Sequence, residues 1–90
     1  MFYVYALFSP SSGKIYIGQT EDLNKRINEH NGVTDLKQWT HKYKPWEVFY
    51  DEKCATRSRA MQREKQLKSG AGRDYLKSVL KEYLEGGKNI

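Results

Sequence analysis

The side chains of this sequence that could take part in chemistry are a group of phenols, a guanidinium with an imidazole, and one carboxylate in an unusual place. Among the phenols, Tyr3 and Tyr5 alternate along one apolar run, and Tyr16 lies in the next run. Because successive side chains of a strand point to opposite faces, these three hydroxyls are expected on one face of a sheet. Gly18 would let backbone or a ligand come close to that face. The alternative is that tyrosines are simply favoured in strands.

The guanidinium and the imidazole belong to the segment that follows. Asp22, Arg26 and His30 are spaced four residues apart, so a helix would put them on one stripe. Leu23 and Ile27 form the adjacent apolar stripe. Arg26 and His30 are therefore candidates for a common site at the edge of the core. A solvent-exposed charged face is the commoner fate of such residues and is the alternative.

The unusual carboxylate is Glu64. In a helix that turns by about 100° per residue, Ala60, Met61 and Leu67 project within about 60° of Glu64, so it interrupts a stripe expected to face the core. An unpaired buried carboxylate is costly, so Glu64 must pair, reach water or bind a cation. An ion pair with Lys68, one turn away, is one account. A metal-binding carboxylate at the edge of a site is the other.

These side chains depend on elements that the hydrophobic pattern predicts in the order ββαβαα. The expected strands cover residues 2–8, 14–19 and 46–50. The first expected helix has Thr20 as its N-cap and Glu21 and Asp22 in its first turn, and it ends at about His30. The second runs from about Ala55 to Ser69, and the third passes through Leu76 to Leu84, with Gly70-Ala71-Gly72 between the two. Val4 and Ala6 should join Ile15 and Ile17 in a core opposite the phenols. The sequence therefore predicts one α+β domain over residues 1–90, a small three-stranded sheet flanked by helices.

The composition favours a polyanionic partner. Lys and Arg number 16 against 11 Asp and Glu, which gives the 90-residue chain a formal net charge of +5. Neutralisation of phosphates supplies most non-specific affinity for nucleic acid, so nucleic acid is the expected partner. The expected contacts are the basic residues of one segment, namely Arg57, Arg59, Arg63, Lys65 and Lys68. The alternative is a basic surface that serves only solubility.

Other classes of protein are disfavoured. No apolar run approaches the roughly 18 residues that a membrane span needs. Residues 1–8 do not match a signal peptide, because they lack a basic leader and a small-residue cleavage site. The single cysteine, Cys54, cannot form an internal disulfide, which favours a reducing, cytoplasmic location. One cysteine and two scattered histidines do not make a zinc site.

The chain resembles the GIY-YIG nuclease superfamily in five elements that occur in order. Tyr3-Val4-Tyr5 stands for the first motif, Gly-Ile-Tyr, and Tyr16-Ile17-Gly18 matches the second motif intact. The helical arginine and histidine of the family fall on Arg26 and His30, and its glutamate falls on Glu64. The resemblance covers roughly residues 2–80 and is strongest to the small, single-domain members.

The resemblance implies a three-stranded antiparallel sheet and an endonuclease that hydrolyses phosphodiester bonds of DNA with one divalent cation, usually Mg²⁺. It suggests DNA repair or recombination as the setting. Glu64 would hold the metal, which would polarise the phosphate and stabilise the leaving oxygen. Arg26 would neutralise charge that develops in the transition state. Tyr5 is the first choice for activating water, with Tyr16 or His30 as its partner. A normal tyrosine pKa is about 10, so this role needs a nearby cation or metal.

The chain departs from the family pattern at two places. The first glycine of the first motif is Tyr3. The asparagine that many members carry after the glutamate helix is absent, because no asparagine occurs between Asn31 and Asn89. His41, in the irregular segment 33–45, is a further candidate for lining the site, and a solvent-exposed loop histidine is its alternative.

Two other functions compete with the nuclease. One is a nucleic-acid-binding module of the same fold with little or no activity. The other is a protein-interaction domain whose basic surface is incidental. Binding alone needs no carboxylate facing the core. The nuclease is therefore favoured by the joint presence of Tyr5, Tyr16, Arg26, His30 and Glu64.

Overall fold

The computed structural model describes residues 1–31, 43 and 45–86. Three strands form one antiparallel sheet, in which β1 lies between β2 and β3. The elements in chain order are β1 (Phe2–Phe8), β2 (Ile15–Thr20), α1 (Leu23–His30), β3 (Glu47–Cys54), α3 (Arg57–Lys68) and α4 (Gly70–Glu85). The predicted α+β class, the order ββαβαα and the antiparallel sheet are confirmed.

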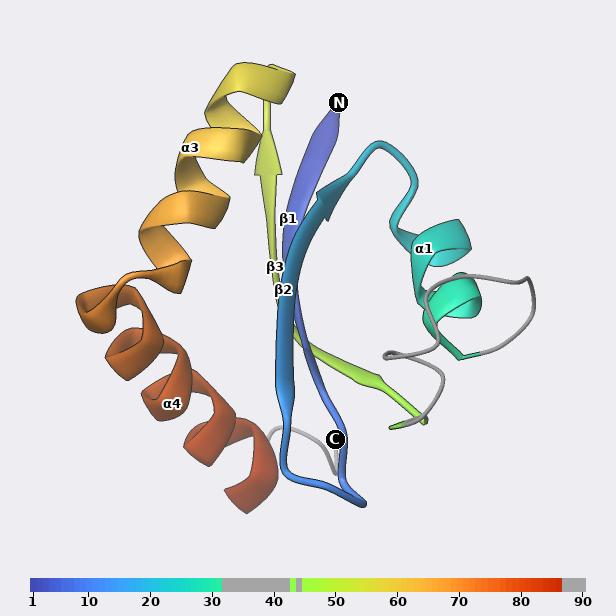
Figure 1. The fold of residues 1–90 in the computed structure, drawn as a ribbon, viewed down its shortest axis with the longest axis vertical. Coiled ribbons are helices and arrows are strands. Elements are labelled where there is room, and N and C mark those ends of the chain that lie inside the picture. The colour runs from blue at the N-terminus through green and yellow to red at the C-terminus, as the bar shows by residue number, and fades with distance from the viewer. Residues whose placement is uncertain (32–42, 44, 87–90) are drawn as a thin grey trace.

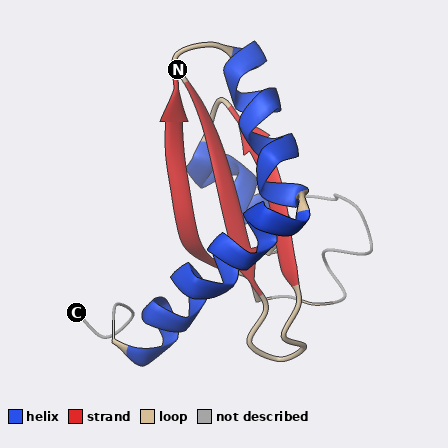
Figure 2. Ribbon diagram, turned by 90° about the vertical axis from the view of Figure 1, so that its left-hand side faces the viewer, coloured by secondary structure: helices blue, strands red, loops and turns tan. Residues whose placement is uncertain are grey.

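Both faces of the sheet are covered, and each is covered by a different part of the chain. Helices α3 and α4 pack on one face and α1 lies on the other, with the edge strand β2 between them (Figure 1). In Figure 2, α3 and α4 run one after the other across the front of the sheet. None of the helices in the described part of the chain is both long and apolar enough to cross a membrane.

The strand alternation divides the apolar residues between two cores. Val4 and Ala6 are fully buried under α3 and α4, where Ile15 and Ile17 pack against their cluster. The predicted core on this face is thus confirmed. Fully buried Tyr5 belongs to a second cluster on the α1 face, together with Leu7 and Trp46. The phenol of Tyr5 therefore enters the structure from the face opposite α3.

The start of α1 differs from the prediction. Asp22, not Thr20, is the N-cap, because its carboxylate accepts a hydrogen bond from the Lys25 backbone N–H at 3.1 Å. Thr20 instead ends β2, where pairing with Tyr3 keeps its backbone extended. Glu21 and Asp22 consequently lie before the first turn rather than inside it. Both threonine and aspartate are good caps, so the strand pairing decided between them.

The triplet Gly70-Ala71-Gly72 was also assigned wrongly, because it begins α4 instead of separating two helices. Ser69 ends α3 and caps α4, with its hydroxyl accepting a hydrogen bond from the Gly72 N–H at 3.3 Å. A Cβ on Gly72 would lie 2.5 Å from the Cα of Leu67. This glycine therefore serves the close approach of α4 to α3.

Two further predictions need correction. Met61 was expected to face the core, but 55% of it is exposed, whereas Ala60 and Leu67 are buried. The sheet-facing direction of α3 lies between Ala60 and Leu67, and Met61 projects about 100° away from Ala60. The third strand extends to Cys54 rather than ending at Tyr50, because residues 51–54 continue the pairing with β1.

Candidate active site

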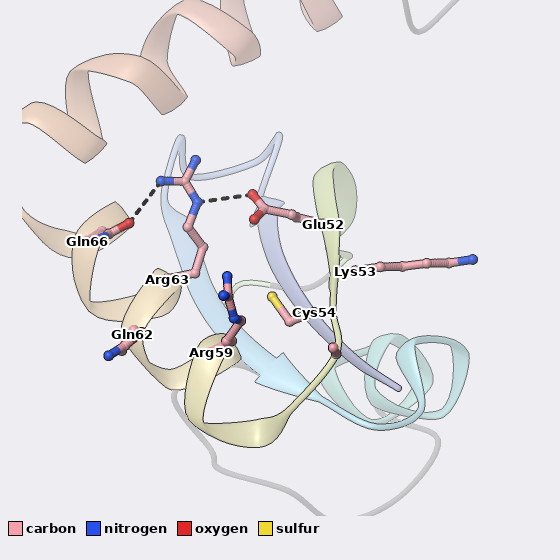
Figure 3. A pocket seen from close by; sticks show the side chains of 8 residues that line it. Glu52, Lys53, Cys54, Arg59, Gln62, Arg63 and Gln66 are labelled. Carbon is pink, nitrogen blue, oxygen red and sulfur yellow. Dashed lines mark hydrogen bonds and ion pairs between the residues drawn. The ribbon is translucent and has the colours of Figure 1, made fainter.

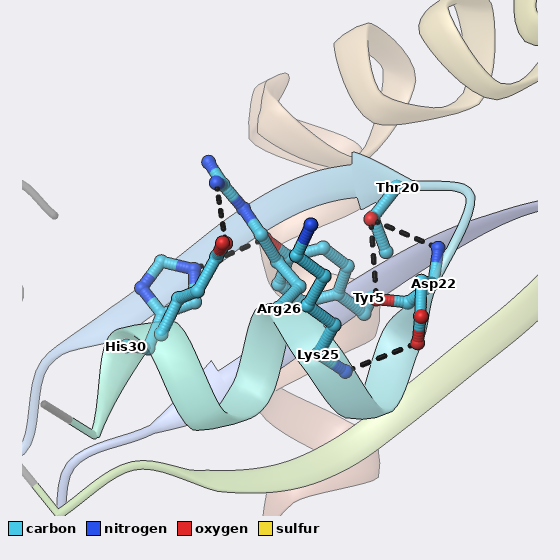
Figure 4. Close-up of polar contacts among 7 residues, drawn as sticks. Tyr5, Thr20, Asp22, Lys25, Arg26 and His30 are labelled. Atoms are coloured by element: carbon cyan, nitrogen blue, oxygen red, sulfur yellow. Dashed lines mark hydrogen bonds and ion pairs between the residues drawn. The ribbon is translucent and has the colours of Figure 1, made fainter. Parts of the chain in front are cut away.

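A tyrosine, a histidine and an arginine meet on the α1 face of the sheet. The Tyr5 hydroxyl lies 3.1 Å from Nε2 of His30, and both residues are fully buried. Nε of Arg26 donates a longer hydrogen bond, of 3.4 Å, to the same hydroxyl. Arg26 and His30 lie one turn apart on α1, so the spacing of four residues brings both to β1 (Figure 4). The phenol of Tyr5 thus joins an imidazole and a guanidinium.

Tyr16 completes an aromatic cluster around this group. Its ring centroid lies 4.5 Å from that of His30 and 6.2 Å from that of Tyr5. Tyr16 is only half-buried, so it is the phenol nearer to solvent. The face that the alternation of Tyr5 and Tyr16 predicted is therefore observed.

Gly18 is the reason that the Tyr5 hydroxyl can reach across β2. It pairs with Tyr5 in the sheet. A Cβ on Gly18 would lie 2.7 Å from the Tyr5 hydroxyl oxygen and 3.0 Å from Cε1 of Tyr16. Heavy atoms do not approach so closely without a hydrogen bond, so only glycine leaves room for both rings. The close approach at Gly18 is made by the Tyr5 side chain, whereas the sequence suggested backbone or a ligand.

The environment of Tyr5 keeps it protonated near neutral pH. Burial raises the pKa of Tyr5 to about 12, against the opposing effect of the hydrogen bond from Arg26. The charge of Glu64 adds to the rise. For Arg26, burial works against the charge, but hydrogen bonds to Tyr5 and Glu29 outweigh it and hold the pKa of Arg26 above its usual range. The site therefore carries a permanent cation beside a neutral phenol.

Raising the pH above 10 is expected to destabilise the fold through Tyr5. The unfolded tyrosine ionises near pH 10, whereas burial moves the pKa of folded Tyr5 to about 12. Between these values the folded state keeps a proton that the unfolded state has lost, so the free energy of unfolding falls by about 1 kcal/mol per pH unit.

Urea unfolding of the wild type and of Tyr5→Phe across this pH range measures the effect, because the variant should lose its part of the slope. Tyr50, whose pKa burial also raises to about 12, contributes separately and is removed by Tyr50→Phe. An unchanged alkaline slope in Tyr5→Phe would contradict the assigned environment.

Glu64 lies beside this cluster rather than in contact with it. Its carboxylate is half-buried, with 23% of the side chain exposed, and accepts a hydrogen bond from Nζ of Lys68 at 2.7 Å. The ion pair that the sequence offered as an alternative is thus present. Because the charge of Glu64 helps to raise the pKa of Tyr5, the carboxylate is within electrostatic reach of the phenol. The structure therefore joins four of the five predicted side chains directly, whereas Glu64 acts on Tyr5 through its charge alone.

A groove beside the cluster carries charges of both signs. Its cavity of about 420 Å³ is lined by the end of β2, by the cations Lys25, Arg26 and Arg57, and by the carboxylates of Glu21, Asp22 and Glu29. Arg57 is 64% exposed, and its contact with Glu21 is 3.9 Å long, so its charge is available to a ligand. Lys25 was missed by the sequence analysis, although it adjoins Arg26 on a predicted helix.

Two further residues that the sequence analysis missed hold the cluster in place. Glu29 accepts a hydrogen bond from Nη1 of Arg26 at 3.1 Å, and the spacing of three residues would have indicated this pair. Trp46 is buried, with its ring centroid 6.4 Å from that of His30. The side-chain amide of Asn31 binds both backbone polar groups of Trp46. No local pattern pointed to this contact between distant segments.

The five basic residues predicted to bind nucleic acid do not form one patch. Arg57 lines the groove and Lys68 pairs with Glu64. Arg59 and Arg63 lie on the other flank of α3, where they line a cleft of about 430 Å³ beside the end of β3 (Figure 3). Lys65 is exposed between these flanks. The basic surface is therefore divided along α3.

Glu64 suits a divalent cation that keeps most of its water. Among the described residues, no three His, Cys, Asp or Glu side chains lie close enough together to hold a metal ion. Mg²⁺ does not need such a cage, because it is usually bound by one or two carboxylates, waters and substrate phosphates. The single, half-buried carboxylate of Glu64 is compatible with this mode of binding. His41 lies outside the described residues.

Comparisons with known proteins agree with this geometry. A family model described as the GIY-YIG catalytic domain matches residues 1–75. A UPF0213 protein of Bacillus pumilus is 39% identical over 67 residues, which are 74% of this chain and 66% of that protein. A UPF0213 protein of Staphylococcus saprophyticus is 31% identical over 77 residues, covering 86% and 92% of the two chains. The solution NMR structure of a UPF0213 protein from Bacillus halodurans aligns with a TM-score of 0.51 at 26% identity, covering 88% of this chain and 85% of that one.

Proposed function

Because this chain belongs to the GIY-YIG family, we propose that it is an endonuclease that hydrolyses phosphodiester bonds of DNA with one divalent cation. The observation that carries the proposal is the junction of Tyr5, His30 and Arg26 through one phenolic hydroxyl, beside a groove to which Lys25 and Arg57 also contribute. A binding module would not need this buried polar junction. We expect the protein to act as a single domain in the cytoplasm, in repair or recombination of DNA.

Glu64 is the residue that would hold the cation. When bound, Mg²⁺ would act as a Lewis acid on the phosphoryl group and stabilise the leaving oxygen. In the ligand-free structure Lys68 balances the carboxylate at 2.7 Å. The side chain of Lys68 is half-exposed and has a flexible stem. If a cation bound the Glu64 carboxylate, the Lys68 ammonium could leave it and move toward a DNA phosphate.

Arg26 would bind the phosphate that is cleaved. Its guanidinium is held from two sides, by the Tyr5 hydroxyl and by the Glu29 carboxylate, while the side chain keeps about 30% of its surface exposed. A fixed guanidinium can donate two hydrogen bonds to phosphate oxygens and needs no rearrangement as charge develops. Its role is to stabilise the transition state.

Proton transfer from the attacking water is assigned to Tyr5, with His30 as its partner. The 3.1 Å contact between the hydroxyl and Nε2 lets the imidazole accept the phenolic proton, and the phenolate would then lie beside Arg26. The pKa of Tyr5 is about 12 even with Arg26 beside it, so this role would need the positive charge of a bound cation as well. Tyr16 is the alternative base, because it is the more accessible phenol.

The test is cleavage of supercoiled plasmid by the purified protein. With Mg²⁺ the protein should convert supercoiled plasmid to relaxed circles, and a chelator should stop the conversion. The pair between Glu64 and Lys68 favours one competing function, a binding module in which the carboxylate needs no metal. DNA binding without nicking at high protein concentration would establish that module and end the nuclease proposal.

A further inference from the structure

Helix α3 carries its cations on two opposite flanks. It lies on the sheet through the buried side chains of Ala60 and Leu67. Arg57 contributes to the groove at the end of β2, which identifies one flank. On the other flank, Nε of Arg63 donates a 3.0 Å hydrogen bond to Glu52 of β3. The groove at the end of β2 and the β3 cleft therefore lie on opposite flanks of this helix.

The β3 cleft is built to receive an anion. Its one acidic side chain, Glu52, is already occupied by hydrogen bonds from the Tyr50 hydroxyl at 2.5 Å and from Arg63. Those two bonds hold the pKa of Glu52 below its usual range, with the Tyr50 bond contributing most, so the carboxylate stays charged and fixes Arg63. Within the described part of the chain, Arg59 makes no ion pair. Its planar guanidinium is suited to a phosphate.

The outer surface of α3 is open and lacks acidic side chains. Ser58, Gln62 and Lys65 lie along it and are exposed. Figure 2 shows α3 in front of the sheet with no described segment across it. An α-helix with its side chains is about 10–12 Å wide, and the major groove of B-DNA is about 12 Å wide. A helix of this width fits the major groove, and there each flank of α3 would face one of the two phosphate backbones.

We propose that α3 docks in the major groove of duplex DNA, so that the β2 groove takes the strand to be cut and Arg59 in the β3 cleft contacts the backbone of the opposite strand. This inference rests on the proposed function for the identity of the cut strand. It names the substrate class, because a single strand has no second backbone for the cleft. Duplex RNA has a major groove too deep and narrow to admit a helix.

The test is Arg59→Gln, which removes the charge of the side chain. The substitution keeps the backbone N–H of residue 59, which donates a hydrogen bond to the hydroxyl of the N-cap Thr56. Binding is measured without divalent cations, by fluorescence anisotropy over a salt series, on duplex DNA of about two helical turns, on one of its strands and on the matching RNA duplex. Each phosphate contact contributes about −0.9 to the slope of log K against log salt for duplex DNA. The slope of log K against log salt on duplex DNA should therefore be shallower for the variant by about 0.9.

The same variant should keep the wild-type slope on the single strand. Lys81→Gln removes a charge from an exposed position of α4 and should alter neither slope. An unchanged duplex slope in Arg59→Gln, or wild-type binding to duplex RNA as tight as to duplex DNA, would overturn the inference. These outcomes are independent of catalysis. If the protein nicks plasmid but Arg59→Gln does not change the duplex slope, the nuclease proposal survives and the docking mode fails. If Arg59→Gln changes the duplex slope but the protein does not nick plasmid, the docking mode survives and the nuclease proposal fails.

Discussion

Replacing Glu64 by Gln is expected to reduce plasmid nicking by on the order of 10³-fold, because a Lewis-acid cation supplies several kcal/mol of transition-state stabilisation. The variant keeps the shape and hydrogen-bonding capacity of the side chain but removes the charge that a cation needs. Among the described residues, the Glu64 carboxylate accepts a hydrogen bond only from Lys68, so the substitution should leave the fold intact. DNA affinity should stay equal or rise, since a negative charge near phosphate is removed and Lys68 is released.

The measurements for Glu64→Gln separate metal binding from catalysis. Nicking rates are followed against Mg²⁺ concentration, and binding of Mn²⁺ to the protein without DNA is followed by electron paramagnetic resonance. Asp74→Asn makes the same change of charge at an exposed site on α4 and should behave as wild type in both. Full activity in Glu64→Gln, or unaltered Mn²⁺ binding, would exclude this carboxylate as the metal ligand while leaving the tyrosine, histidine and arginine junction in place.

Where one regular period governs a segment, the sequence predicted the structure well. The alternation of Val4 with Tyr5 determined the face that each side chain occupies. A strand has only two faces, and here each face of β1 packs into a different core. The spacing between Arg26 and His30 placed both on one side of α1. Such arguments succeed because the period of the element alone decides the direction of the side chain.

The sequence could not predict features that depend on how two elements pack against each other, because the residues involved are locally equivalent. Ala60 and Met61 are both apolar, and only docking of α3 on the sheet decides that Ala60 is buried while Met61 is exposed. The basic residues of α3 are close in sequence, yet the sheet edges on either side divide them into two sites. Trp46 reaches the cluster through a tertiary contact with Asn31, for which no local pattern exists.

A methyl group at Gly18 is expected to damage both folding and catalysis. The Cβ of Gly18→Ala would lie 2.7 Å from the Tyr5 hydroxyl oxygen and 2.9 Å from Cζ, and the buried ring has no free space to move into. Overpacking of this kind costs about 1–3 kcal/mol of stability. Displacing the hydroxyl from Arg26 and His30 should slow nicking by on the order of 10²-fold, as loss of an aligned catalytic group does.

Gly70→Ala is the matched control for Gly18→Ala, because the same methyl group enters open space at Gly70. Thermal unfolding and plasmid nicking of both variants should show losses only at Gly18. Combining Gly18→Ala with Tyr5→Phe should recover part of the lost stability, since removing the hydroxyl relieves the closest contact but leaves the one with Cζ. If the two substitutions were additive, or if Gly18→Ala nicked plasmid at the wild-type rate, the close approach of Tyr5 to β2 would not be what positions the hydroxyl. Non-additivity would instead tie the glycine of the second motif to the tyrosine of the first by direct packing, a reason for their joint presence that requires no contact of Gly18 with DNA.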